Sequence, residues 1–441
     1  MTESNRITAK VEGLSFTGLP FILHEGEQII IPGKYFPGDM LSLTLELDSL
    51  KVSEIELDFP SPIRVKPDCH HYGHCSGCDL LEMSEKGRKY EKSQMMARAL
   101  ALLSSDVVPD FLSDTSIVRY LPRLTFYQGK NPEFRESGLL ASKEAVSEGR
   151  SDIVPIKSCA IAVQPINRRI LSLRRILNEV APVIDRITLM ASADLEQGFI
   201  SNVAAHAVLA KDRNSEAYRK DFIKIMRAAD LSGLSIATAN GEIEQTYGHL
   251  AIPGLVAPER GFESASAEPS VAVQDNVFMN RTLIHRVLKY VEPAPGLYVV
   301  EGFAGAGNFT LPIARKGAEI HAMDWDPAAT KLALRNLYQD GQRERARIIT
   351  GDVSKDLTLF RPNPDVLLLN PPCKGTKNIA DILKTLRPKK VVSVFSELST
   401  MVSDCSAIIS EGYEIVEASG LDMYPRTSKV GAVIMMTKAK A

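Results

Sequence analysis

The sequence lacks several features that would assign it to a special class of protein. It contains no apolar run near the roughly 20 residues that a membrane-spanning helix requires. Its first ten residues, MTESNRITAK, have no apolar signal core, so we expect the protein to stay in the cytoplasm. It also lacks an excess of one charge, because its formal net charge is only -2. This balance neither indicates nor excludes a nucleic-acid partner, since local patches of charge decide such binding.

Cysteine is scarce, with six residues in 441, and half of them are clustered. Cys69, Cys75 and Cys78 fall within CHHYGHCSGC, and Cys159 follows in VPIKSCAIAV. In a reducing compartment such clusters indicate metal binding or catalysis, and four thiolates can hold zinc or an iron–sulfur cluster. A tight group of three with one remote partner favours a 4Fe–4S cluster. Alternative ligands in the same stretch are His70, His71 and His74.

The chain is long enough for about two to four domains. Strand-sized segments broken by Gly, Pro and Asp fill residues 1–60, which predicts a small oligonucleotide-binding (OB)-like β-barrel or a β module without a ligand. Residues 61–269 mix strand and helix patterns without a repeat, which predicts a central α+β domain. In residues 270–441 strands alternate with helices, as is typical of a doubly wound, Rossmann-like sheet. The predicted fold class is therefore multidomain α/β.

The ligand of a doubly wound sheet binds at the carboxyl ends of its strands. VVEGFAGAGNF places Gly305 between a predicted strand and a helix, where a bare backbone can approach a ligand, although Thr310 replaces the third glycine of a dinucleotide motif. Asp324 ends the next strand, where a carboxylate can bind ribose hydroxyls. Asp352 ends the third strand, placed to accept from an adenine amino group, and Asn370 ends another. A nucleoside without a pyrophosphate cradle suits S-adenosylmethionine (SAM), although turn-forming Asp and Gly residues of an ordinary α/β domain would give the same pattern.

In this order, the segments resemble the iron–sulfur, TRAM-domain RNA uracil-5-methyltransferases over nearly the whole chain. VAVQDN is similar to the family's Phe-Phe-Gln-x-Asn segment, and EGFAGAGNF is similar to its Leu-Tyr-Cys-Gly-x-Gly-x-Phe turn. The resemblance implies a TRAM-type barrel, a 4Fe–4S cluster on the four cysteines, and SAM-dependent methylation of ribosomal or transfer RNA by a monomer. It implies SAM contacts from Gln274, Phe303, Asn308 and Asp324.

The catalytic positions depart from the family's pattern. Family members attack the uracil ring with a cysteine in a Ser-Cys-Asn-Pro stretch, but the matching segment, VFSELSTMVSD, has Ser396 there. Lys429 and Gly431 stand where the family has a histidine and the glutamate that removes the C5 proton, and Asp-Pro-Pro-Arg has become Asn370, two prolines and Cys373. Addition to C6 of a pyrimidine needs a soft anionic nucleophile, which a thiol supplies and an unassisted hydroxyl does not. By the family's mechanism the protein is expected to be inactive or very slow.

Cys373 suggests a way in which activity could be kept. Pro-Pro-Cys is similar to the nucleophile segment of cytosine-5 methyltransferases, and the charge of Lys374 would favour a thiolate. We therefore hypothesise that the nucleophile has moved from Ser396 to Cys373, with Glu397, Lys429 or water as the base. Alternatively, Cys373 only fills the space of the family's arginine.

Other functions stay open on the sequence. NPPC is also similar to the Asn-Pro-Pro-aromatic motif of enzymes that methylate exocyclic amines, where Asn370 would hold the amino group, although Cys373 has no stacking face. The chain could instead be an inactive relative that binds RNA, or a cluster-bearing redox or assembly factor. Basic side chains that could contact RNA phosphates, or be plain solvated residues, are Arg119, Arg123, Arg168, Arg169, Arg174 and Arg175.

Overall fold

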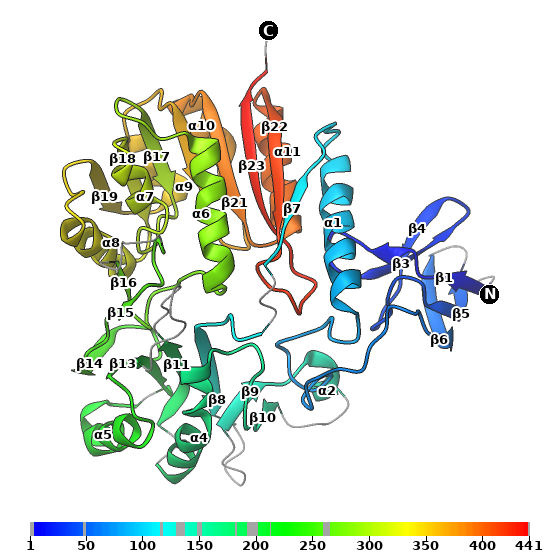
Figure 1. The fold of residues 1–441 in the computed structure, drawn as a ribbon, viewed down its shortest axis with the longest axis horizontal. Coiled ribbons are helices and arrows are strands. Elements are labelled where there is room, and N and C mark those ends of the chain that lie inside the picture. Colours follow the sequence, from blue (N-terminus) through cyan, green and yellow to red (C-terminus); the bar gives the residue numbers. More distant parts are fainter. Residues whose placement is uncertain are drawn as a thin grey trace.

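In a computed structural model, the described residues form three main groups of strands and a separate two-stranded sheet of β15 (Ile252–Pro253) and β16 (Ser266–Ala267) (Figure 1). Two small sheets come from the N-terminal residues, a seven-stranded sheet from the middle of the chain, and an eight-stranded sheet mostly from the C-terminal residues. The described residues are 4–46, 50–114, 118–128, 137–147, 152–180, 183–191, 202–211, 213–258 and 265–439. Within these ranges no helix is both long and apolar enough to span a bilayer.

The N-terminal strands form two antiparallel three-stranded sheets around one core. The first has the order β1 (Ser4–Lys10), β5 (Met40–Glu46), β6 (Lys51–Phe59), and the second β2 (Gly13–Leu14), β3 (Pro20–His24), β4 (Glu27–Ile30). Buried and half-buried residues alternate along β5, because successive side chains of a strand point to opposite faces. Leu41, Leu43 and Leu45 thereby pack with Ile22 and Ile31. The assignment to the OB or TRAM type stays a prediction.

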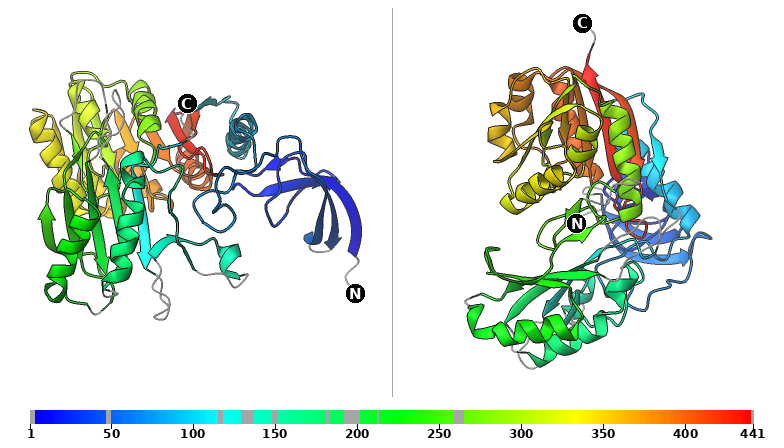
Figure 2. Two further views of the ribbon diagram at one scale, coloured as in Figure 1. Left: turned by 60° about the horizontal axis from the view of Figure 1, so that its bottom comes forward. Right: turned by 60° about the vertical axis from the view of Figure 1, so that its left-hand side comes forward.

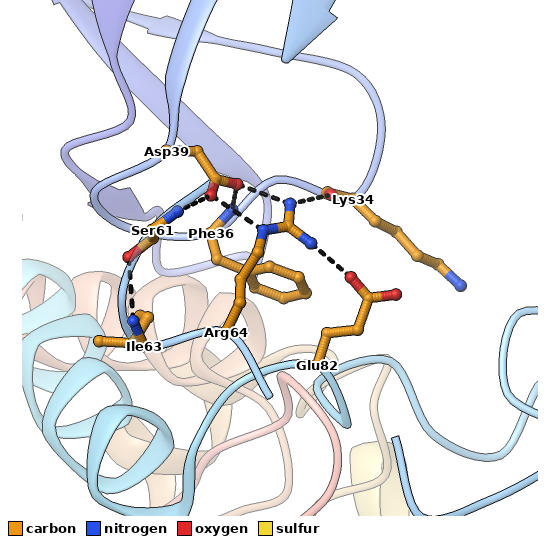
Figure 3. A network of polar contacts seen from close by, with 7 residues as sticks. All are labelled: Lys34, Phe36, Asp39, Ser61, Ile63, Arg64 and Glu82. Atoms are coloured by element: carbon orange, nitrogen blue, oxygen red, sulfur yellow. Dashed lines mark hydrogen bonds and ion pairs between the residues drawn. The ribbon is translucent and has the colours of Figure 1, made fainter. Parts of the chain in front are cut away.

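A charged network ties these strands to the next part of the chain (Figure 3). Arg64 donates to both carboxylate oxygens of Asp39, at 2.9 and 2.7 Å, and pairs with Glu82. Asp39 also accepts from the backbone N–H groups of Phe36 and Ser61, each at 2.8 Å. Burial raises the pKa of Asp39, but these bonds outweigh it and hold that pKa below its usual range. The N-terminal sheets are therefore fixed to the segment that carries the clustered cysteines.

The central sheet is mixed and has helices on one face. Its strands, in spatial order, are β10 (Ile153–Val154), β9 (Ser137–Leu140), β8 (Arg123–Gln128), β11 (Ile184–Ala191), β12 (Val203–Leu209), β13 (Gly233–Ala237) and β14 (Ile243–Gly248). Helices α4 (Ile170–Glu179) and α5 (Arg219–Ala228) pack on it through Leu173, Ile176 and Phe222. Shorter elements are α2 (Lys143–Ser147), α3 (Gln164–Asn167), η1 (Glu216–Tyr218), β15 (Ile252–Pro253) and β16 (Ser266–Ala267).

The eight-stranded sheet confirms the predicted alternation of strands and helices. Its strands, in spatial order, are β19 (Ala346–Thr350), β18 (Glu319–Asp324), β17 (Tyr298–Gly302), β20 (Val366–Leu369), β21 (Lys390–Phe395), β23 (Gly431–Lys438), β22 (Tyr413–Leu421) and β7 (Asp110–Leu112). The first five are parallel to one another, and β23 pairs antiparallel with both of its neighbours. The carboxyl ends of the five parallel strands therefore meet at one edge of the sheet.

Helices cover both faces of this sheet, as a doubly wound fold requires (Figures 1 and 2). One face is covered by α6 (Val277–Val291), α7 (Thr310–Arg315) and α8 (Pro327–Gln339). The other is covered by α1 (Glu85–Ala101), α10 (Ile379–Leu386) and α11 (Leu398–Ser410), with α9 (Val353–Asp356) and η2 (Leu357–Leu359) nearby. Helix α1 and strand β7 lie within residues 61–269, yet both pack with the C-terminal sheet.

The loop between β22 and β23, residues 422–430, is held by a buried ion pair. Lys92 of α1 donates to the Asp422 carboxylate at 2.6 Å and to the Tyr424 carbonyl at 2.7 Å. The side chains of Lys92 and Asp422 are 0% and 2% exposed. Because both charges are out of water, each depends on the other for its solvation.

Two further contacts hold the same loop from the cysteine-bearing segment. Arg426 donates to both carboxylate oxygens of Asp68 at 2.7 Å, a bidentate geometry that fixes direction as well as distance. Ser428 donates its N–H and its hydroxyl to the two oxygens of Asp79, also at 2.7 Å. The loop is therefore clamped by residues that precede and follow the three clustered cysteines.

We expect Lys92→Ala to lower the free energy of unfolding by about 3–5 kcal/mol, because it leaves the Asp422 carboxylate buried without a cation. The matched control is Lys89→Ala on the same helix, whose partner Glu85 is 44% exposed, and its loss should stay near 0.5 kcal/mol or below. Urea denaturation of the anaerobically purified protein, followed by circular dichroism, measures both. Equal losses in the two variants would contradict a dominant role for the buried pair.

Candidate functional site

A cavity of about 280 Å³ opens at the carboxyl ends of the parallel strands. We call it the donor cavity. Its walls come from the turn after β17, the ends of β18, β20 and β21, and the 422–430 loop. Among the predicted site residues, those that line it are Gln274, Phe303, Asn308, Asp324, Asn370 and Ser396. Residues from five separated parts of the sequence thus meet where a doubly wound sheet binds its ligand.

The glycine turn leaves open space in this cavity. Gly305 has φ +56°, and no atom lies within 4 Å of where its Cβ would be, so a side chain there would project into the cavity. Phe303 also has positive φ, at 63°, which is rare for a residue with a side chain and typical of functional turns. Asp324 braces the turn by accepting from the N–H of Gly305 at 2.8 Å. Burial raises the pKa of Asp324.

Two predicted cofactor residues have side chains engaged elsewhere. The amide of Asn308 exchanges hydrogen bonds with that of Asn280 at 2.9 and 3.0 Å, and accepts from the N–H of Ala257 at 3.0 Å. Its side chain therefore braces α6 against the cavity wall. Asp352 lies outside the lining of the donor cavity, and its carboxylate caps α9 by accepting from the N–H of Ser354 at 3.0 Å. The structure thus shows a local capping role for Asp352, outside the lining of the donor cavity.

Trp325 lines the donor cavity and was not predicted from the sequence. It is the chain's single tryptophan, and it is 71% exposed although aromatic side chains of this size are usually mostly buried. Its position directly after Asp324, the acidic end of β18, was the available signal. An exposed indole at a nucleoside-sized cavity offers a stacking face.

The two candidate nucleophiles lie next to each other. The Sγ atom of Cys373, an exposed residue, is 3.5 Å from the Oγ atom of Ser396. Helix α11 holds the loop that carries Cys373, since the Thr400 hydroxyl donates to the Cys373 carbonyl at 2.7 Å and Asp404 accepts from the N–H of Thr376 at 2.8 Å. The thiol therefore lies next to the hydroxyl of Ser396, which lines the donor cavity, and the two residues follow adjacent parallel strands.

Charged groups surround this pair. Lys429 forms an ion pair with Glu397 at 2.9 Å. Burial lowers the pKa of Lys429, but Glu397, and after it a Cys373 thiolate, raise it above its usual range. Gly431 lines the donor cavity without offering a proton acceptor, and a Cβ there would be 3.0 Å from Cγ of Met423. A larger side chain at 431 would therefore require Met423 to move.

The four predicted metal-binding cysteines line a second cavity of about 210 Å³. We call it the cysteine cavity. Burial raises the pKa of Cys75 and Cys159, and raises that of Cys78 to about 12. Of the three neighbouring histidines in the described chain, only His71 lines it. Across the described ranges, no three His, Cys, Asp or Glu side chains are grouped closely enough to hold a metal ion.

Tyr424 separates the two cavities and lines both of them. Its hydroxyl donates to the carboxylate of Asp275 at 3.5 Å, and burial raises the pKa of both groups. Neither residue was predicted, because their proximity depends on the 422–430 loop, which lies 149 positions away from Asp275 in the sequence.

Comparisons with known proteins agree with this geometry. Residues 271–407 match the family described as the TRM5/TYW2 methyltransferase domain. The 23S rRNA (uracil(1939)-C(5))-methyltransferase RlmD of Shewanella sp. (strain ANA-3) is 27% identical over 457 aligned positions, which cover 99% of this chain and 98% of that protein. The RlmD of Shewanella baltica (strain OS195) is 26% identical and is covered to 97%.

A solved structure shares the fold along the whole chain. It is that of Pyrococcus abyssi tRNA (uracil-54, C5)-methyltransferase in complex with S-adenosyl-L-homocysteine, with a TM-score of 0.69 and 17% identity. The similarity covers 98% of this chain and 100% of the other. Along its full length the chain is therefore similar in sequence to the RlmD proteins named as 23S rRNA uracil-C5-methyltransferases, and it shares the fold of the Pyrococcus abyssi enzyme.

Proposed function

We propose that the protein transfers the methyl group of SAM to C5 of a uracil in ribosomal or transfer RNA. The observation that carries the proposal is the donor cavity, which is lined by Gln274, Phe303, Asn308, Asp324 and Asn370 at the carboxyl ends of the strands. Full-length similarity to 23S rRNA uracil-C5-methyltransferases supports the same activity. A cytoplasmic location and a monomeric state stay predictions.

The donor cavity has groups suited to each part of SAM. The Asp324 carboxylate lies in the lining, where it can accept from ribose hydroxyls. Trp325 offers a face for stacking on the adenine. The open side of Gly305 leaves room for the rest of the donor.

Cys373 is the nucleophile in this proposal. Its thiolate would add to C6 of the uracil, and the electron pair displaced toward C5 would then take the methyl group, releasing S-adenosylhomocysteine. Removal of the C5 proton restores the double bond and breaks the bond between C6 and sulfur. The distance of 3.5 Å to Ser396, which stands at the family nucleophile's position, supports this role because the thiol can reach nearly the same place.

The charges around Cys373 narrow the choice of base. Lys429 is protonated near neutral pH, because its pKa is raised above a usual value that is already near 10.4. It therefore cannot accept the C5 proton, but its ammonium can balance the charge of the thiolate. Glu397, which forms the ion pair with Lys429, or a water molecule is left as the base.

Methylation of an exocyclic amine is the second candidate function. Asn370, which would hold the amino group, lines the donor cavity, whereas Cys373 does not belong to its lining. This route needs no covalent adduct and no base at position 431. The product and the requirement for Cys373 separate the two routes.

We also propose that Cys69, Cys75, Cys78 and Cys159 hold a 4Fe–4S cluster. The four cysteines line one cavity, whose volume of about 210 Å³ exceeds the space of a single ion. Because thiols bind metals as thiolates, a cluster would compensate for the burial that disfavours their ionisation. A bound cluster would supply a rigid cross-link, which would hold Asp68 and Asp79 against the 422–430 loop.

We expect S-adenosylhomocysteine to change the fluorescence of the single tryptophan in a saturable titration, because Trp325 lines the donor cavity. Asp324→Asn should weaken this binding about 10- to 100-fold, since it removes charge-assisted hydrogen bonds worth roughly 1.5–3 kcal/mol. Asp352→Asn is the matched control and should bind as the wild type does. The reverse order of effects in these two variants would contradict the proposed ribose contact.

We expect Cys373→Ala to lower methyl transfer by about 10³-fold or more, because it removes the nucleophile. Ser396→Ala should retain most of the activity. The assay incubates anaerobically purified protein with labelled SAM and ribosomal or transfer RNA from a strain that lacks it, and identifies the methylated nucleoside by mass. Full activity of Cys373→Ala with an N-methylated product would favour the exocyclic-amine route. If the wild type were inactive, the proposed methyl transfer would be wrong and the alternative of an inactive relative that binds RNA would be favoured.

A further inference from the structure

A third cavity, of about 330 Å³, lies on the surface of the central domain. Its walls come from the residue before Tyr120, the turn around Cys159 and helix α3. The polar side chains that line it are those of Arg119, Ser158, Gln164, Asn167 and Arg168. Arg119 and Arg168 lie 49 positions apart in the sequence, so the fold brings two guanidinium groups to one concave surface.

Both arginines are without a protein partner in the described part of the chain. Each is exposed, and neither side chain forms a hydrogen bond or an ion pair with any described residue. Their neighbour Arg169 differs, since it is buried and pairs with Asp230 at 2.7 Å. None of the described residues that line the cavity is acidic. Two like charges thus share one cavity with no countercharge, which favours an anion there.

The cavity also has further hydrogen-bond donors, and hydrogen bonds within the protein hold its wall in place. The side chains of Ser158 and Gln164 form no hydrogen bond with described residues, so their donors are available to a ligand. Asn167 is different: its amide accepts from the N–H of Cys159 at 2.8 Å and donates to the carbonyls of Cys159 and Ala162 at 2.9 and 2.7 Å. These bonds hold the turn that separates this cavity from the cysteine cavity.

We propose that Arg119 and Arg168 together bind one backbone phosphate of the RNA substrate. This inference rests on the proposed function and identifies a contact that would position the RNA. The planar forks of two guanidinium groups match the oxygens of a phosphate better than a point charge does. Phosphate contacts fix the register of a nucleic acid without reading its sequence.

The position of the cavity fits an RNA that reaches the donor cavity. Cys159 lines both this cavity and the cysteine cavity, and Tyr424 lines both the cysteine cavity and the donor cavity. A target base has to leave its stack to enter the donor cavity, so the flanking backbone must be held on the neighbouring surface. The paired arginines lie along this series of adjoining cavities.

The test measures how salt weakens RNA binding. A fluorescein-labelled transcript of the 23S rRNA segment around uridine 1939, the position in the relatives' names, is titrated with holo-protein and S-adenosylhomocysteine between about 50 and 200 mM salt. Each phosphate neutralised contributes roughly 0.7–0.9 to the slope of log K against log salt. Arg119→Ala and Arg168→Ala should each weaken binding about tenfold and lower that slope by about 1.

The double variant tests whether one phosphate is shared. If both arginines hold the same phosphate, the double variant should lower the slope by about as much as either single variant. A slope loss twice as large would overturn the shared site. The matched control is Arg175→Ala, an exposed arginine on α4 outside the cavity lining, which should leave the slope unchanged.

Failure of this inference is distinct from failure of the proposed function. If the wild type methylates RNA but both single variants keep its salt slope, the phosphate site is wrong and the activity stands. An equal loss in Arg175→Ala would also overturn the site, because it would indicate a general effect of charge. Saturable Trp325 fluorescence with S-adenosylhomocysteine in every variant verifies that the fold is intact.

Discussion

The geometry of the site depends on the buried ion pair between Lys92 and Asp422. Such a pair adds little net stability, because desolvation of two charges offsets most of their attraction. It does fix position, since a slip of the 422–430 loop would separate the charges in an apolar surrounding. The same loop carries Tyr424, which lines the donor cavity, and Lys429, which pairs with Glu397. A link made by α1 therefore determines where groups of the donor cavity lie, although α1 is more than 300 residues away in sequence.

The N-terminal sheets are fitted to this loop as well. Gly18 has φ +85°, and a Cβ there would be 2.7 Å from both Cβ and Oγ of Ser428. Only glycine allows this approach, because a side chain would strain the backbone and displace Ser428 from Asp79. The N-terminal sheets, the cysteine-bearing segment and the wall of the donor cavity thus meet at one loop. Displacement of any one of them would be transmitted to the donor cavity.

The sequence was sufficient to predict the parts of the site that depend on local patterns. The parallel strands, the glycine turn and Asp324 follow from alternation and spacing, and the structure brings Gly305 and Asp324 within hydrogen-bond distance. The role of Asp352 was harder to predict, because an aspartate at a strand end can face a ligand or cap the next helix. In the structure it caps α9. The position of Trp325 directly after Asp324 indicated that it lies near the cavity. Its exposure could not be predicted, because packing decides whether an indole is buried.

Contacts made across long stretches of chain could not be predicted. Strand β7 pairs with β22, and α1 packs on the C-terminal sheet, because each covers apolar surface that its neighbours in sequence leave open. Periodicity identifies the apolar face of α1 but carries no information on which sheet it meets. Tyr424 and Asp275 are adjacent only because the clamp positions the 422–430 loop. Tyr424 lines both cavities and Asp275 lines the cysteine cavity. The sequence therefore could not predict the contact at which the two cavities meet.

The positions of Cys373 and Ser396 are consistent with the proposed change of nucleophile. Cys373 and Ser396 follow the adjacent strands β20 and β21, and their Sγ and Oγ atoms are 3.5 Å apart. A nucleophile at either position would therefore lie at nearly the same place. Thr400 and Asp404, which follow Ser396 on helix α11, hold the loop that carries Cys373. The proposed role of Cys373 as nucleophile therefore needs no new scaffold. In the proposed mechanism, the ion pair of Lys429 with Glu397 would supply a cation near the thiol and a carboxylate beside that cation, in place of the histidine and glutamate that the resemblance implies.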